Sequence, residues 1–209
     1  MAKRAPLDAP VARSPIRPTE PVAVVDGWEV STRRSGAALR LADWTPMAKL
    51  GVRAEPPFAG VAFGRARRDD RGVLTIGSGP DEWLLLFPPG VPVRVLTHGQ
   101  PFTAVDLTHG RALVRLTGDR APDLLAKVCA IDLSDRVTPN GTAFRSAVAK
   151  LVTDVVRDDL EDGTRSYLLH CERSSGQYLF DALLDAGAEF AIDVDGYALP
   201  PPDDRDTTT

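Results

Sequence analysis

One carboxylate in this sequence stands where it could do chemistry. Asp106 ends a strand-like run and is followed closely by Thr108, His109 and Gly110. A carboxylate at a strand end can accept hydrogen bonds from an amine or a heterocyclic N–H, and when partly buried its charge stabilises a cationic, iminium-like species. The alternative is structural, because the same carboxylate can close its own turn by accepting from the N–H groups of Thr108 and Gly110. The sequence leaves both roles open.

The other residues capable of chemistry lack the spacing of a known catalytic or metal site. The histidines, His98, His109 and His170, lie far apart, and none has a second histidine four residues on that would make a helical metal pair. The acidic residues within 158–162 lack the alternation of a calcium-binding loop. No Gly-rich phosphate loop opens a helix, and no G-x-S-x-G nucleophile turn is present. We therefore expect no metal site in this chain.

Composition and charge exclude several classes of protein. The chain has 209 residues and a formal net charge of −4, which argues against a dedicated nucleic-acid binder. Its longest apolar run, residues 83–87, is far shorter than the roughly 20 residues that a membrane span needs. Two cysteines, Cys129 and Cys171, have no CxxC spacing, and no signal peptide is recognisable, so we expect reduced thiols in the cytoplasm. Neither nucleic acid nor a membrane is an expected partner.

The 18 prolines and the hydrophobic pattern divide the chain into a body and two tails. The first 21 residues are rich in Pro, Ala and Arg and have no hydrophobic period, so we expect a disordered tail over residues 1–27. Residues 28–199 have the length of one domain, which can bury about 70% of its unfolded surface. Residues 200–209 form a second expected disordered tail, which is acidic.

The elements that must position Asp106 are mostly short strands. Hydrophobic patterning predicts two helices, one capped by Asp119 with Pro122 in its first turn, and one opened by Ser174 and Gln177. About eight strands in clusters, together with two helices, indicate an α+β fold with antiparallel sheets. The predicted strands lie near 47–54, 72–77, 82–87, 103–108, 111–117, 144–149, 151–157, 166–171 and 188–194.

Part of this body resembles a known family. The run from Ala104 to Leu133 is similar to the folate-binding domain of the aminomethyltransferases, the T-proteins of the glycine cleavage system. The family's ordered features have counterparts in Asp106-Leu-Thr-His109, Gly118, Leu125, Asp132, Pro139-Asn-Gly141 and Val155-Val-Arg-Asp-Asp159.

Within that superfamily the chain most resembles the gamma subunits of heterotetrameric sarcosine oxidase. Three segments carry the resemblance, which extends over about residues 39–194: Gly79-Pro-Asp-Glu-Trp-Leu84, the Lys-x-Cys-x-x-Asp-Leu stretch from Lys127 to Leu133, and Arg173-Ser-Ser-Gly-Gln-Tyr178. The resemblance implies two ferredoxin-like β-α-β halves with antiparallel sheets and an exchanged first strand.

The resemblance also implies a role. The complex demethylates sarcosine oxidatively to glycine with FAD, FMN and NAD, and can pass the one-carbon unit to tetrahydrofolate. A gamma subunit is implied to be non-catalytic, to bind none of these cofactors alone, and to assemble with the alpha, the flavin-bearing beta and the delta subunits.

The site residues implied by the resemblance are Asp106, Thr108 and Trp83, as parts of a folate-like pocket. Asp106 aligns with the catalytic aspartate of the T-proteins. Two departures weaken a catalytic role, because Thr108 replaces the family's Ser and Gly110 replaces a larger residue. The alternative function is an autonomous tetrahydrofolate-binding enzyme of the aminomethyltransferase type that uses Asp106.

Overall fold

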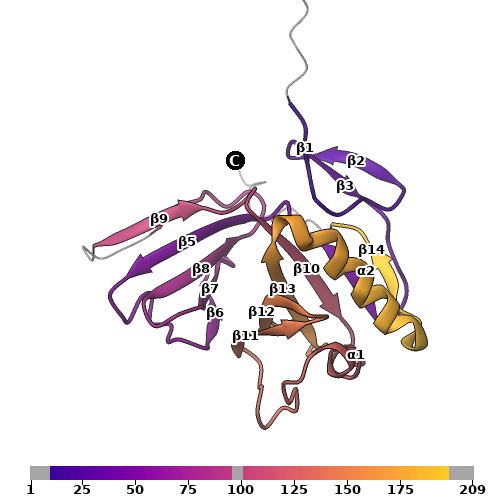
Figure 1. Ribbon diagram of the computed structural model, residues 1–209. Helices are drawn as coiled ribbons and strands as arrows, with labels where there is room; N and C mark the ends of the chain where they lie inside the picture. The colour runs from indigo at the N-terminus through magenta and orange to yellow at the C-terminus, as the bar shows by residue number, and fades with distance from the viewer. Residues whose placement is uncertain (1–9, 96–100, 198–209) are drawn as a thin grey trace, which may run out of the picture.

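The computed structural model describes residues 10–95 and 101–197. The sheet with the most strands in it has six (Figure 1). Neighbouring strands of this sheet are antiparallel, except that β14 runs parallel to β4. In spatial order its strands are β11 (Ala143–Val148), β12 (Leu151–Arg157), β13 (Ser166–Glu172), β10 (Arg111–Thr117), β4 (Arg40–Asp43) and β14 (Asp193–Asp195).

A second sheet of five strands, antiparallel throughout, packs against one face of the first. Its order is β6 (Ala66–Arg68), β7 (Leu74–Gly77), β8 (Glu82–Phe87), β5 (Ala48–Ala54) and β9 (Phe102–Asp106). The apolar run of β8 is buried on both faces, as its unbroken hydrophobic sequence predicts. Leu84 and Leu86 face the six-stranded sheet, whereas Trp83, Leu85 and Phe87 belong to a cluster on the far side.

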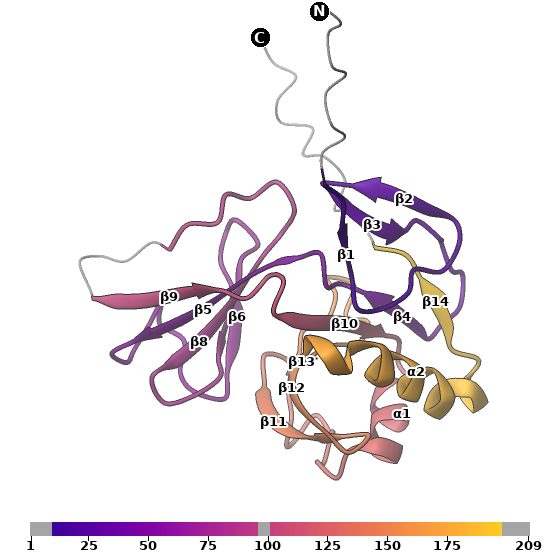
Figure 2. The ribbon, with the colours of Figure 1, turned by 45° about the horizontal axis from the view of Figure 1, so that its top comes forward.

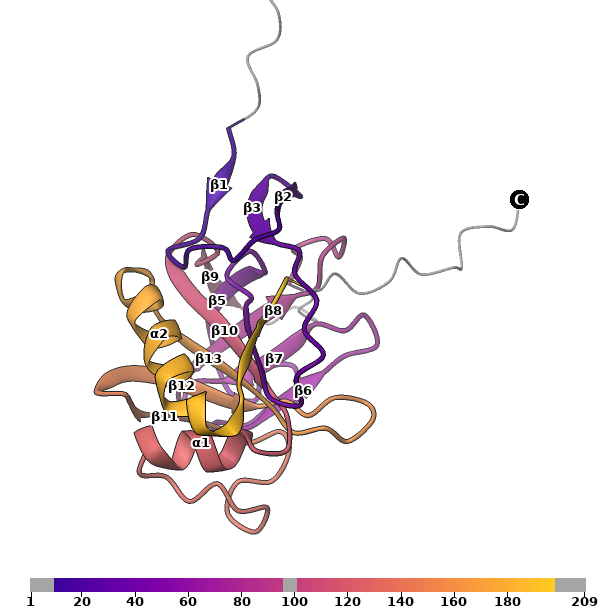
Figure 3. The same ribbon diagram turned by 90° about the vertical axis from the view of Figure 1, so that its right-hand side faces the viewer.

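Two helices cover the opposite face of the six-stranded sheet (Figure 3). They are α1 (Ala121–Val128) and α2 (Gly176–Gly187), and short 3₁₀ turns at Arg173–Ser175 and Ala188–Phe190 flank the second. Leu124, Leu125, Leu179 and Leu183, all at most 1% exposed, form the apolar stripes that the sequence predicts. The central sheet is thus covered by helices on one side and by the five-stranded sheet on the other. No helix in the described residues is long and apolar enough to cross a membrane.

The fold class is α+β with antiparallel sheets, as predicted, but the helices are distributed differently from the expectation. Both helices pack on the six-stranded sheet. Within residues 10–95 and 101–197, the five-stranded sheet carries no helix. The prediction of two ferredoxin-like β-α-β halves is therefore not confirmed.

The N-terminal segment also differs from the expectation. Residues 10–27 belong to the predicted disordered tail of residues 1–27, yet they contain β1 (Ala12–Arg13) and β2 (Val22–Val25). These strands flank β3 (Trp28–Ser31) in a small third sheet on the β4–β14 side of the molecule (Figure 2). Ile16 is 1% exposed and joins the helix-covered core. The prediction was wrong for residues 10–27 because one deeply placed apolar side chain and two very short strands leave no periodic pattern. The expected tail at 200–209 lies outside the described residues.

Candidate functional site

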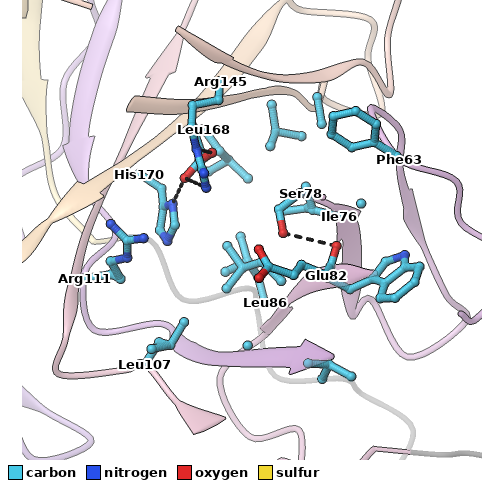
Figure 4. A pocket seen from close by; sticks show the side chains of 18 of the residues that line it. Phe63, Ile76, Ser78, Glu82, Leu86, Leu107, Arg111, Arg145, Leu168 and His170 are labelled. Atoms are coloured by element: carbon cyan, nitrogen blue, oxygen red, sulfur yellow. Dashed lines mark hydrogen bonds and ion pairs between the residues drawn. The ribbon is translucent and has the colours of Figure 1, made fainter. Parts of the chain in front are cut away.

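A cavity of about 880 Å³ lies between the two large sheets and is the best candidate for a binding site (Figure 4). The five-stranded sheet lines it through β5, β7, β8 and β9, and the six-stranded sheet lines it through β10 to β13. Its walls are mainly apolar. A volume in the hundreds of Å³, apolar walls and a few polar groups are typical of small-molecule sites.

Strand alternation places Asp106 outside this cavity. Thr103, Val105 and Leu107 line it, and these residues alternate along and just beyond β9. Because successive side chains of a strand point to opposite faces, Asp106 is directed away from the cavity. The residue singled out by the sequence therefore does not face the cavity between the sheets.

The Asp106 carboxylate is engaged in its own turn. Its Oδ1 accepts a hydrogen bond from the Thr108 N–H at 2.8 Å, whereas the Gly110 N–H donates to the Leu107 carbonyl at 3.0 Å. The hydrogen bonds from Thr108 lower the pKa of Asp106, and the nearby His109 and Lys49 add to the shift. The structural alternative from the sequence is the one that this geometry matches, with Thr108 as the donor and Gly110 bonded elsewhere.

Thr108 also stabilises this turn, through hydrogen bonds with Lys49. The Thr108 hydroxyl oxygen accepts from the Lys49 backbone N–H at 3.1 Å. The Lys49 side chain, 1% exposed, donates from Nζ to the carbonyl oxygens of Thr45 at 2.6 Å, Met47 at 2.9 Å and Thr108 at 3.3 Å. Burial lowers the pKa of Lys49 to about 7, against the opposing pull of Asp43 and Asp106. Lys49 and Thr108 thus join the start of β5 to the turn before β10.

Trp83 lines the cavity, but its ring and its indole N–H are both engaged in core contacts. Its side chain is 2% exposed, its Nε1–H donates to the Val61 carbonyl at 2.9 Å, and its ring packs against Phe58 with centroids 5.3 Å apart. Of the three predicted site residues, only Trp83 lines the cavity. The structure does not bring Asp106, Thr108 and Trp83 together in one pocket.

A buried polar side chain that lines the cavity is that of His170, which in the sequence stood out only as one of three histidines without metal-site spacing. His170 is 6% exposed, and its Nδ1 lies 3.1 Å from Asp154 Oδ2. Arg145 binds the same carboxylate from Nε at 2.7 Å and from its terminal nitrogen at 3.2 Å. These contacts hold the pKa of Asp154 at about 2 despite partial burial, whereas burial lowers the pKa of His170.

No local signal in the sequence points to this group. Asp154 and His170 lie on adjacent antiparallel strands and are paired directly, Asp154 with His170, in the register of β12 and β13. Both stretches were predicted as strands, but pairing and register are needed to see that the two side chains meet. That information is not present in either stretch alone.

The remaining charged residues at the cavity are paired. Arg111 binds the Glu172 carboxylate at 2.5 Å, and Arg53 binds Glu82. No group of three or more His, Cys, Asp or Glu side chains in the described part of the chain could hold a metal ion. Both cysteines are buried and unpaired, and burial raises the pKa of the Cys171 thiol to about 11.

A second cavity, of about 820 Å³, is lined by charged residues that form ion pairs with one another. Arg115 stacks over Trp44 at 4.7 Å and lies 3.1 Å from Asp158, and Arg68 binds the same carboxylate at 2.5 Å. Its buried charges are therefore committed to holding the protein together, which makes it a weaker candidate than the cavity between the sheets.

Comparison with known proteins finds similarity to sarcosine oxidase gamma subunits. A family model described as "Sarcosine oxidase, gamma subunit family" matches residues 73–189. The sarcosine oxidase subunit gamma of Corynebacterium sp. (strain P-1) is 28% identical over 160 residues, which cover 68% of this chain and 77% of that protein. The protein of the same name from an Arthrobacter species is 27% identical over the same coverage.

Two solved structures share the fold. The first is a chain of the heterotetrameric sarcosine oxidase from Corynebacterium sp. U-96, with a TM-score of 0.60 and 24% identity, covering 77% of this chain and 89% of that one. The second is the glycine cleavage system aminomethyltransferase T from Bartonella henselae, with a TM-score of 0.61 and 14% identity. The match covers 84% of this chain but 55% of that enzyme, so this chain corresponds to about half of it.

Proposed function

The chain belongs to the sarcosine oxidase gamma subunit family, and we propose that it is the gamma subunit of a heterotetrameric sarcosine oxidase. The observation that carries the proposal is the family match over residues 73–189, which includes both helices and all the strands around the cavity except β5. The two gamma-subunit relatives support it. The reaction of the complex would be the oxidative demethylation of sarcosine to glycine.

We propose that this subunit is non-catalytic and acts in assembly. Two contacts support this view: the Asp106 carboxylate is committed to the Thr108 N–H, and the Trp83 indole is committed to the Val61 carbonyl. The Trp83 indole N–H is therefore already used, and the Asp106 carboxylate faces away from the cavity between the sheets. The autonomous transferase that uses Asp106 is consequently not favoured.

The partners and cofactors follow from the same proposal. The chain would assemble with alpha, beta and delta subunits, which would hold FAD, FMN and NAD and the site for tetrahydrofolate. A cytoplasmic location is proposed with it, supported by two thiols that remain unpaired. For the fold, we propose that β10, α1, β12, β13, α2 and β14 make one ferredoxin-like half into which β4 is inserted; the spatial order β12-β13-β10-β4-β14 supports this.

Co-expression tests the assembly role. The full chain, carrying an affinity tag, is produced with the alpha, beta and delta subunits of the same organism and passed over a size-exclusion column. We expect the four chains to elute together and the complex to oxidise sarcosine. Elution of this chain as a lone monomer while the other three assemble would contradict the proposal.

A variant of the same complex tests the non-catalytic role. Asp106→Ala in the assembled complex is expected to leave sarcosine oxidation and its tetrahydrofolate-dependent product unchanged per assembled complex. Asp106→Asn serves as the matched control, because its amide oxygen can still accept from Thr108. Loss of the folate-dependent product in both variants, with assembly intact, would show that the carboxylate takes part in transfer.

A further inference from the structure

The cavity between the sheets contains one buried polar atom without a partner. Among residues 10–95 and 101–197, His170 Nε2 has no hydrogen-bond partner, and it has almost no exposed surface, although the residue lines a space of about 880 Å³ (Figure 4). A buried polar atom left unpaired costs about 1–3 kcal/mol. Because His170 lines this cavity, a ligand bound there that donated a hydrogen bond to Nε2 would remove this cost.

The neighbours of His170 fix what this atom can do. Asp154 is held ionised by Arg145, so it can only accept, and the imidazole must place its proton on Nδ1 to donate to it. The other ring nitrogen, Nε2, then carries a lone pair and is an acceptor. Arg111 on β10 and burial both disfavour the imidazolium form.

The walls of the cavity are apolar on both sides of His170. Ile76, Leu84 and Leu86 come from the five-stranded sheet, and Leu113, Val156 and Leu168 from the six-stranded one. Phe63 and Val105 also line the cavity and are 62% and 57% exposed, so they stand where it opens to solvent. This combination matches a molecule with an apolar body.

We infer that this cavity binds a small, mainly apolar molecule that carries an N–H or O–H donor, and that His170 Nε2 accepts the hydrogen bond from that donor. An anion fits poorly, because Arg111 and Arg145 are already paired with Glu172 and Asp154, and a carboxylate would face the lone pair of Nε2. The inference concerns a ligand of this chain itself and goes beyond the assembly role.

A matched pair of probes tests the inference. Indole and 1-methylindole have the same ring system, but only indole has an N–H donor. Their affinities are measured by calorimetry for the full-length chain, both alone and in its complex, and for two variants. His170→Phe removes the acceptor and keeps a ring, and His109→Phe changes a histidine that stacks on Trp28 at 4.7 Å, outside the cavity.

We expect indole to bind about 3- to 10-fold more tightly than 1-methylindole, the range that one net hydrogen bond provides. The preference should persist in His109→Phe and disappear in His170→Phe. In the unmodified chain labelled with ¹⁵N-histidine, indole should move the His170 Nε2 resonance and 1-methylindole should not, a measurement that stands even if His170→Phe does not fold.

Several results would overturn the inference. They are equal affinities of the two probes, a preference that survives in His170→Phe, no binding of either probe at its solubility limit, or an Nε2 resonance that both probes leave in place. Binding to the free chain that is lost in the complex would also overturn it, since a neighbouring subunit would then fill the cavity.

Discussion

At the scale of single residues, the Asp106 carboxylate is best explained by the turn it closes. Its alternation with Val105 and Leu107 puts it on the face of β9 away from the cavity, and its Oδ1 accepts a hydrogen bond from the backbone N–H two residues on. That geometry is the one by which Asp residues commonly fix turns. A residue that looks suited to stabilising a cation is used here to join β9 to β10.

Asp106→Ala should therefore act on stability. Losing the hydrogen bond to the Thr108 N–H should lower the free energy of unfolding by about 1 kcal/mol. Asp106→Asn, which keeps an acceptor, should lower it by only a few tenths. Urea unfolding followed by circular dichroism measures both. An Asp106→Ala chain as stable as the unmodified one would mean that the turn does not depend on this contact.

The His170–Asp154 pair should make the protein sensitive to acid. Because burial lowers the pKa of His170 from its ordinary 6.5, the unfolded chain binds a proton below pH 6.5 that the folded chain does not. Stability from this group is thus lost as the pH falls below 6.5. The charged groups that face or influence the ring are Asp154, Arg145, Arg111 and Lys49.

Urea unfolding at a series of pH values checks this prediction. His170→Phe should flatten the fall in stability just below pH 6.5, whereas Val152→Ala, a change at a 72% exposed position on the same strand as Asp154, should keep it. The loss that belongs to Asp154 should come at lower pH, below 3.8, because its pKa is about 2. Identical slopes for His170→Phe and the unmodified chain would refute the assignment.

At the scale of elements, the strands followed the sequence more closely than the helix ends did. The predicted strands 82–87, 111–117 and 151–157 have the observed limits. The expected caps are not used: Arg120 precedes α1 without a side-chain cap, and Gln177 accepts from the Arg17 N–H. At Gln177, this tertiary hydrogen bond takes the place of the predicted capping bond.

The junction between β10 and α1 depends on Gly118. Its φ is 138°, and a Cβ there would lie 2.2 Å from the Ala38 carbonyl oxygen. Gly118→Ala should therefore cost at least about 2 kcal/mol of unfolding free energy. Gly36→Ala, at a position with nothing within 4 Å, should stay within about 0.5 kcal/mol. Thermal or urea unfolding compares the two, and equal stabilities would show that the loop moves aside.

At the scale of the whole molecule, residues 10–27 form an N-terminal strap that contacts both β3 and α2. Ala12 pairs with Trp28, the Arg17 N–H donates to Gln177 of α2 at 2.8 Å, and Ile16 fills the core beneath α2. The segment therefore contributes to the fold, contrary to the expectation of a disordered tail over residues 1–27. The Arg17 hydrogen bond and the burial of Ile16 both involve residues distant in the sequence.

Ile16→Ala measures this contribution. Removing a side chain that is 1% exposed should lower the free energy of unfolding by about 2–4 kcal/mol, through lost burial and the cavity left behind. Val11→Ala, at a position 45% exposed, should change it by less than about 0.5 kcal/mol. If the two variants unfolded alike, the strap would not be part of the cooperative unit.

The sequence by itself determined the class of the fold, most of the long strands, both helical stripes and the family resemblance. Those features rest on periodicity and local motifs, which are written along the chain. Only the tertiary structure decided that Asp106 turns away from the cavity, that Asp154 meets His170 across two strands, and that Ile16 is buried. Each of these depends on register or on contact between distant segments, and a one-residue change of register would reverse which side chains face the cavity.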